Sequence, residues 1–164
     1  MATFKAPGLD KYVAQLERLG KKTDTVIGEA VYEMAKVVAD EVRVRIETLP
    51  SVPDSEGLAA YQEKRKIPIT KAQKWGLAHS FGVASIRNDG GFIHVKLGFD
   101  GYNEVKTKRY TMGQPNALIA RSIESGSSVR DKHPFIRPAV AATRKTAIAA
   151  AEVKLDEKIH SIFE

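Results

Sequence analysis

The chain has 164 residues, which is enough for one domain with a buried core. Its composition, 43% hydrophobic and 28% charged residues, is typical of a folded globular protein rather than a disordered one. The absence of cysteine excludes disulfides, thiolate catalysis and cysteine–zinc sites, and no apolar run approaches the ~18 residues that a membrane span needs. We expect a single domain over residues 1–164, made in a cytoplasm and without a signal peptide.

The net charge of +6 is unevenly distributed along the chain. Residues 61–145 carry 16 basic and 6 acidic side chains, whereas residues 1–60 carry 8 and 10, and residues 146–164 carry 2 and 4. Such segregation is typical of a nucleic-acid surface, but also of subunits whose complementary faces pack together or against an acidic partner. Charge alone leaves these alternatives open.

Two helices are predicted in the first fifty residues. Apolar residues recur at helical spacing over residues 9–19, and Gly20 with the lysines after it is expected to end that helix. A second pattern of steps of three or four runs over residues 27–49, predicting a helix of roughly 24 residues, or ~36 Å, that ends at Pro50. A core helix with a solvated charged face is favoured over a stand-alone coiled coil.

The segment 50–74 shows the weakest pattern. It contains three prolines, acids near its start and then the basic cluster Lys64, Arg65 and Lys66. Because loops beyond ~15 residues are usually functional or mobile, we expect a mobile loop that orders partly on assembly. One helical turn is predicted after it, over residues 75–81, directing Leu77 and Phe81 inward.

A β-hairpin is predicted next. Residues 82–87 and 92–99 are the expected strands, joined by a turn at residues 88–91, where Asn-Asp-Gly-Gly supplies positive φ angles. On the second strand, alternation places four apolar side chains on one face: Ile93, Val95, Leu97 and Phe99. Residues 100–114 are expected to form an extended loop, and they carry Lys106, Lys108 and Arg109.

Two further helices are predicted in the last fifty residues. Pro115 suits a first helical turn, and Gly126 suits the left-handed residue that ends a helix, with Leu118, Ile119 and Ile123 as the apolar stripe between them. A long alanine-rich helix is expected from near Pro134 or Pro138 to the C-terminus. Six apolar residues fall on one face of it: Val140, Ile148, Ala151, Leu155, Ile159 and Ile162. Its alanines favour a helix and would allow another helix to approach closely.

The fold class expected from these elements is α+β. A small antiparallel sheet should pack against the two long N- and C-terminal helices, with a short helix before the C-terminal one. The connection into the last helix reads PFIRPA, in which Phe135 should be buried and Arg137 should point to solvent or to a neighbouring subunit. The loop before it would direct Arg130, Lys132, His133 and Arg137 outward, although an ordinary surface connection explains the same residues equally well.

No catalytic pattern is found. The four histidines lack i, i+4 spacing, and the chain contains no GxSxG motif, phosphate-binding glycine loop or dinucleotide fingerprint. Gly126-Ser127-Ser128 is better explained as a helix-ending turn than as a nucleophile, because no partner pattern accompanies the serines. We therefore expect a protein that is not an enzyme, with no catalytic residue, cofactor or metal.

A family resemblance is carried by LIARSIESGSS, PFIRPA and the long closing helix. Their order resembles the phage tail-component family, which acts at the head–tail junction and is typified by the gene-ten product of a lambdoid siphophage. The matching positions are Glu124, Gly126, Pro134, Phe135, Pro138 and Ala139, with Ser127 where threonine is commoner. GGFIHVKLGFDGYN, followed by TKRY and GQPN, resembles the branch found in prophages of Gram-positive bacteria. The resemblance covers roughly residues 70–145.

The resemblance implies a non-enzymatic virion structural protein of a tailed phage or prophage. Such a protein is made in the host bacterial cytoplasm and forms a homo-oligomeric ring in the head–tail connector or neck, or completes the tail end. The implied partners are other copies of the chain and other neck, connector or tail-tube proteins, with no membrane and with DNA touched only through phosphates. Ten cations are the candidate interface residues: Lys64, Arg65, Lys66, Lys106, Lys108, Arg109, Arg130, Lys132, His133 and Arg137.

One alternative is a small non-catalytic DNA-binding protein of a mobile element. Tyr102 and Tyr110 lie near the basic residues of the 100–114 loop, and aromatic residues among cations are typical of single-stranded nucleic-acid binding. Salt-dependent DNA retention by a dispersed monomer would favour this alternative, whereas ring formation that depends on concentration would favour the junction protein.

Overall fold

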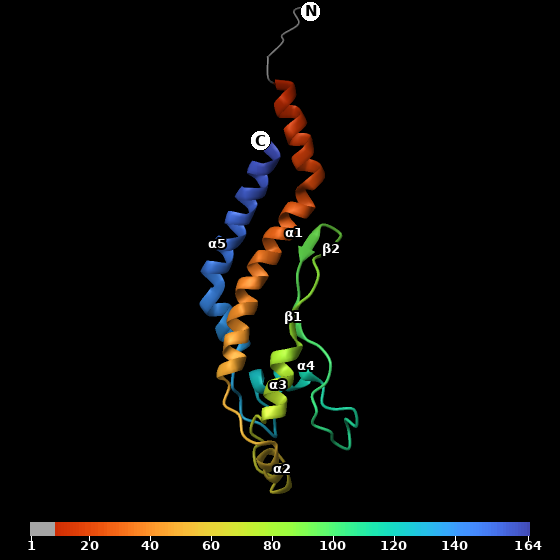
Figure 1. Cartoon of the computed structure of the whole chain (residues 1–164), viewed down its shortest axis with the longest axis vertical. Coiled ribbons are helices and arrows are strands. Elements are labelled where there is room, and N and C mark those ends of the chain that lie inside the picture. Colours follow the sequence, from red (N-terminus) through yellow and green to blue (C-terminus); the bar gives the residue numbers. More distant parts are fainter. Residues whose placement is uncertain (1–8) are drawn as a thin grey trace, which may run out of the picture.

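The computed structural model describes residues 9–164, which form an elongated α+β molecule (Figure 1). The helices are α1 (Leu9–Thr48), α2 (Asp54–Gln62), α3 (Lys71–Ser80), α4 (Asn116–Ser125) and α5 (Ile136–Phe163). The strands are β1 (Phe81–Val83), β2 (Arg87–Asp89), β3 (Phe92–His94) and β4 (Leu97–Phe99). The predicted fold class is confirmed: antiparallel strands accompany two long helices near the ends of the chain, and a short helix precedes the C-terminal one.

The helix α1 is continuous over 40 residues, or ~60 Å. The predicted break at Gly20 is therefore wrong. An interior glycine costs a helix only ~1 kcal/mol, and Gly20 lies on an exposed surface with no atom within 4 Å of the position of a Cβ. Contacts with α5 continue on both sides of it, since Gln15 donates to the Phe163 carbonyl and Lys158 pairs with Glu29 at 2.6 Å.

Small side chains form the contact between α1 and α5, which run antiparallel beside each other (Figure 1). The buried alanines are Ala30, Ala35 and Ala39 on α1 and Ala139 and Ala147 on α5. The bulky residues that the sequence placed on one face of α5 are not all buried: Val140, Ile148 and Ile159 are exposed, while Ile162 is buried. The larger apolar residues do not mark the face of α5 that contacts α1. Alanines form that contact because they let the two helices approach closely, and several larger side chains remain exposed.

The segment 50–74 is more than a loop. It contains α2 and the first turn of α3, whose capping box pairs Thr70 with Gln73 in both directions at 3.3 Å. Val52 is hydrogen-bonded to both Ile69 and Lys71, which joins the two ends of the segment. The helix α2 buries only Gly57 and Ala60, so it leaves little apolar periodicity in the sequence. The mobility expected for this segment stays a prediction.

The hairpin is built from two short ladders rather than one. β1 pairs with β4 and β2 pairs with β3, both antiparallel, and three residues (84–86) lie opposite two (95 and 96), which shifts the register by one. The turn is shorter than predicted: Gly90 and Gly91, with φ of 66° and 93°, connect strands that already include Asn88 and Asp89. The predicted alternation holds along residues 92–99, except that His94 is half-buried.

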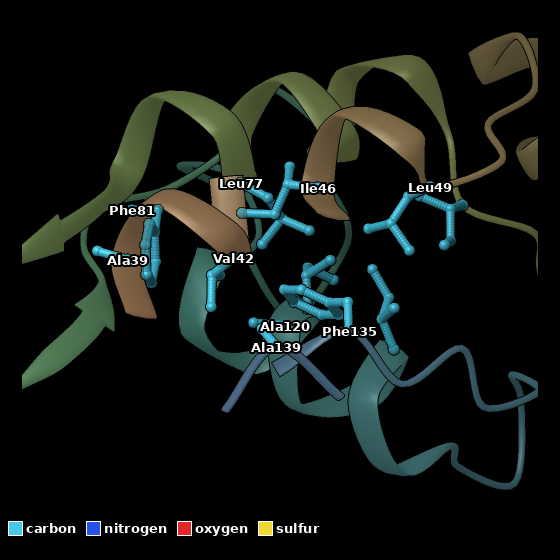
Figure 2. Packing of buried hydrophobic residues seen from close by; sticks show 12 residues of the cluster. Ala39, Val42, Ile46, Leu49, Leu77, Phe81, Ala120, Phe135 and Ala139 are labelled. Atoms are coloured by element: carbon cyan, nitrogen blue, oxygen red, sulfur yellow. The ribbon is translucent and has the colours of Figure 1, made fainter. Parts of the chain in front are cut away.

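The main hydrophobic core lies where the C-terminal half of α1 meets α3, α4 and the start of α5 (Figure 2). Phe135 and Leu77 are fully enclosed there, and Phe81 is buried against Phe99 at 5.0 Å between ring centroids, so all three predicted inward residues are confirmed. On α4, Ile119 and Ile123 are buried as predicted. Leu118 is wrongly predicted, because its position on the helix leaves it 42% exposed.

Candidate interaction surfaces

A buried carboxylate joins α4 to the start of α5. The backbone N–H groups of Phe135 and Ile136 donate to Glu124 Oε2 at 2.7 and 2.8 Å, and that of Arg137 donates to Oε1 at 3.0 Å. Because Pro138 has no N–H and the Ala139 N–H donates to the Phe135 carbonyl, the Glu124 side chain satisfies all the N–H groups that the start of α5 leaves unpaired, and its negative charge lies at the positive end of the α5 dipole. Glu124 therefore caps the N-terminus of α5, a role that the sequence motif containing it did not indicate.

Two opposing effects set the pKa of Glu124. Burial raises it, but the hydrogen bonds from the N–H groups of Arg137, Ile136 and Phe135, with the charge of Arg137, together outweigh burial and leave the pKa below its ordinary value. The Arg137 guanidinium lies 3.5 Å from the carboxylate with its side chain 76% exposed. The prediction for PFIRPA is therefore confirmed in its orientation: Phe135 is buried and Arg137 points to solvent.

Arg130 does not belong to the surface. It was expected to point outward, but only 5% of it is exposed, and burial lowers the pKa of its guanidinium. Its Nη2 donates to Gln73 Oε1 at 2.8 Å, and the Gln73 amide donates in turn to Gln114. Arg130 is drawn inward because the backbone of residues 127–130 closes a tight turn, with hydrogen bonds between Ser127 and Arg130 in both directions.

The cluster at residues 64–66 is exposed as predicted, but its members differ in their bonding. Arg65 pairs with Glu63 at 2.6 Å, and Lys64 has a positive φ of 57°. Lys66 donates to the carbonyl oxygens of Ser127 and Ser128 at 3.2 and 3.0 Å, so it ties the α2–α3 connection to the loop after α4. Lys66 therefore holds two loops together as well as contributing charge.

Lys132 and His133 are exposed in that second loop. The His133 N–H donates to the Ile123 carbonyl at 2.7 Å, which fixes the backbone while leaving the side chain at the surface. Together with residues 64–66 and Arg137, they make up the part of the predicted cationic set that surrounds the α2–α3 connection and the start of α5.

The remaining cations lie in a separate loop between β4 and α4. Lys106, Lys108 and Arg109 are exposed there, and the Arg109 guanidinium lies 5.7 Å from the centre of the Tyr110 ring. The loop is held at its base by Asn103, whose side-chain oxygen accepts from the N–H groups of Val105 and Gln114. No hydrogen bond or ion pair in residues 9–164 joins this loop to residues 64–66.

A second kind of surface, which the sequence did not reveal, is an apolar groove between β4 and α5. Two neighbouring hollows of about 450 and 340 Å³ share Val38, Leu97 and Val140 and therefore form one continuous feature. α1 provides the floor, and the end of the hairpin, α4 and α5 provide the rest of the lining. We call it the β4–α5 groove; its lining includes Val31, Met34, Val38, Val95, Leu97, Phe99, Arg121, Val140, Arg144 and Ile148.

The part of the chain that the structure describes shows neither a cluster of metal ligands nor a helix that could span a membrane. Within the described part of the chain, no cluster of three or more histidine, aspartate or glutamate side chains has the arrangement to hold a metal ion. No helix of residues 9–164 combines the length and the apolar character that crossing a bilayer requires.

Comparison of the chain with family models, with curated proteins and with solved structures gave no match.

Proposed function

We propose that the chain is a non-enzymatic structural protein of the virion of a tailed phage or prophage. It would be a subunit of a homo-oligomeric ring in the head–tail connector or neck, or at the completed tail end. Its partners would be other copies of itself and the neighbouring neck, connector or tail-tube proteins. The motif resemblance over residues 70–145 supports this role, and the observation that carries the assembly part of it is the size of the molecular surface.

The accessible surface is far larger than that of a compact monomer. It measures 11401 Å² for a chain of 18.0 kDa, whereas a compact monomer of that mass exposes about 8,000 Å². Subtracting about 1,200 Å², close to the most that eight residues of average size can expose, still leaves an excess of roughly 2,000 Å². An excess of this size is comparable to the area that stable protein–protein interfaces bury.

Many large hydrophobic side chains are exposed on this surface. They lie on α1 and α5, and also on α2, α3, β3 and the β4–α4 loop. They include Tyr12, Leu16, Val44, Leu58, Tyr61, Trp75, Phe92, Met112, Val140, Ile148 and Val153. Apolar exposure at both ends and along the sides of the molecule is what a subunit with several neighbours requires.

The two ends of the molecule also differ in character. The helical arm formed by α1 and α5 points away from the cationic loops around α2 and the β4–α4 connection (Figure 1). A ring needs two different surfaces that are complementary to each other, because head-to-tail contacts close only when they are heterologous. A subunit with unlike ends and sides meets this need.

The proposed role can be tested by removing the gene from the phage or prophage that carries it. Electron microscopy of the lysate should show filled heads and tails that are not joined, or tails with an abnormal end. Normal, joined and infectious particles in the absence of the gene product would contradict the proposal.

A second candidate is a non-catalytic DNA-binding protein, which the exposed loop with Lys106, Lys108 and Arg109 favours. The stacking of Arg109 near Tyr110 resembles the mixture of cations and aromatic rings used to hold single strands. Retention of DNA that weakens steeply as salt rises, by a protein that stays monomeric, would support this candidate over the first.

A further inference from the structure

The first turns of α1 carry an apolar stripe that nothing in the described chain covers. Tyr12, Val13 and Leu16 are 62%, 46% and 58% exposed, and their spacing of three and four places them on one side of the helix. Figure 1 shows α1 continuing past the end of α5, and near that end Gln15 donates to the carbonyl of Phe163, the last residue of α5. We call these three side chains the N-terminal stripe.

The β4–α5 groove has matching properties. Its lining is mainly aliphatic, it is open along its length, and Val140 and Ile148 at its α5 wall are each 45% exposed. A groove with an α-helical floor and apolar walls is suited to an amphipathic helix that inserts one side chain every three or four residues.

The N-terminal stripe cannot enter the groove of its own molecule. Leu16 and Val38 lie on the same continuous helix, 22 residues or ~33 Å apart. Since Val38 is part of the floor of the groove, the helix would have to break and reverse to bring Leu16 to it. Any contact between these two surfaces therefore joins two copies of the chain.

Charge complementarity favours the same pairing. Glu17 lies beside the stripe on α1 and has no ion-pair partner among the described residues. Arg121 and Arg144 line the groove and also have no ion-pair partner within residues 9–164. An acid at the edge of the inserted helix and cations at the rim of the groove would fix the orientation of the contact.

The excess accessible surface of the chain is large enough for a contact between the N-terminal stripe of one copy and the β4–α5 groove of another. Every subunit of a ring built this way uses two surfaces, one for each half of a heterologous interface. A standard interface buries ~800 Å² on each partner, so the two halves together need ~1,600 Å² per subunit. The excess surface of roughly 2,000 Å² estimated above accommodates both halves.

From these observations we infer that the N-terminal stripe of one copy inserts into the β4–α5 groove of a second copy. The inference rests on the proposed function for its ring, and it assigns the contact that builds that ring. Because the stripe and the groove are different surfaces, the contact repeats from subunit to subunit.

Two single substitutions test the inference from opposite sides. Leu16→Asp places a charge in the stripe, and Val140→Asp places one in the groove; both residues are exposed, so neither change should impair folding. Val153→Asp is the matched control, because Val153 is 57% exposed on α5 but lines a different hollow. Thermal melts of all three variants should stay close to that of the parent protein.

Sedimentation across a range of concentrations gives the readout. The parent and Val153→Asp should form larger species as concentration rises, while Leu16→Asp and Val140→Asp should associate at least about tenfold more weakly. An equimolar mixture of the two defective variants should form dimers but nothing larger. Only one intact stripe and one intact groove are then available, and they lie on different molecules.

Three results would overturn the inference. These are a parent that stays monomeric at the highest concentration, normal association by either defective variant, and a mixture that yields no dimer. If the parent stays monomeric while phage carrying Val140→Asp still fails to join heads to tails, the groove holds another neck protein and the inference is wrong. The gene-removal experiment is independent, so failure of this contact and failure of the proposed function can be told apart.

Discussion

The carboxylate of Glu124 offers the sharpest test of how this fold is held together. In Glu124→Ala, the buried N–H groups of Phe135 and Ile136 would lose their acceptor. An unsatisfied buried donor costs ~1–3 kcal/mol, and loss of a helix cap alone costs ~0.5–2 kcal/mol. The ion pair with Arg137 adds little, because the guanidinium is largely exposed. We therefore expect the free energy of unfolding to fall by about 3 kcal/mol.

For a domain of this length, 1 kcal/mol corresponds to ~2–4 °C in Tm, so Glu124→Ala should melt about 6–12 °C below the parent. Thermal denaturation followed by circular dichroism measures the shift, and Glu63→Ala, which removes an exposed acid, is the matched control. A shift below about 2 °C would refute the reasoning, since it would mean that water or another group replaces the carboxylate without cost.

A different variant, Glu124→Gln, tests the lowered pKa of the Glu124 carboxyl in the parent protein. In the unfolded chain Glu124 has its ordinary pKa of 4.5, and in the folded chain the pKa is lower. The ionised form therefore stabilises the protein fully above the unfolded-state pKa, and this stabilisation is lost as the pH falls through the folded-state pKa. The difference in Tm between the parent and Glu124→Gln should be constant near neutral pH and shrink below about pH 4.5. A difference that grows on acidification would contradict the assignment.

Two further predictions concern packing and backbone geometry. Phe135→Ala should lower the free energy of unfolding by ~3–5 kcal/mol and yield poorly folded protein, because the ring is fully enclosed. Arg137→Ala should lower it by less than ~1 kcal/mol, because the guanidinium is largely exposed. Equal shifts in Tm for the two variants would show that the wrong residue was assigned to the core. Gly113→Ala should lower Tm more than Gly82→Ala does. Gly113 has a φ of 114°, and a Cβ there would collide with the Asn103 carbonyl, whereas a Cβ at Gly82 would meet nothing within 4 Å. Equal values of Tm for the two variants would contradict this.

The sequence predicted best where local chemistry dominates. The Gly90-Gly91 turn, the alternation along residues 92–99 and the end of α4 at Gly126 all depend on positive φ or on side-chain period, which neighbouring residues determine. The orientation of PFIRPA was also predictable, since proline fixes the entry into the helix and residues two apart on a helix point in different directions.

The errors occur where tertiary contacts decide. Gly20 is a helix breaker only if nothing else holds the helix, and the contacts of α5 with α1 hold it. Arg130 was assigned to the surface by its charge, but a tight turn and Gln73 enclose it. The face of α5 that contacts α1 was not predicted, because alanine, the weakest apolar signal, forms the contact stripe.

Some features of the candidate interaction surfaces could be predicted from the sequence, and others depend on tertiary contacts. Exposure of most of the predicted cations could be anticipated from charge, and the amphipathic pattern of residues 9–19 was visible in the sequence. What could not be anticipated is that the described residues leave Tyr12, Val13 and Leu16 exposed, because that depends on where α5 ends. The β4–α5 groove is assembled from α1, the end of the hairpin, α4 and α5, which are distant in sequence, so no local pattern predicts it.

The proposed role is tested most directly by complementation in vitro. Purified protein would be added to a lysate of the phage or prophage from which this gene has been removed, and infectious, joined particles would be counted. The account predicts that the protein restores joining of heads and tails within the mixture, and that Leu16→Asp and Val140→Asp do so poorly. Joined particles without any addition, or no restoration by the unaltered protein, would contradict it.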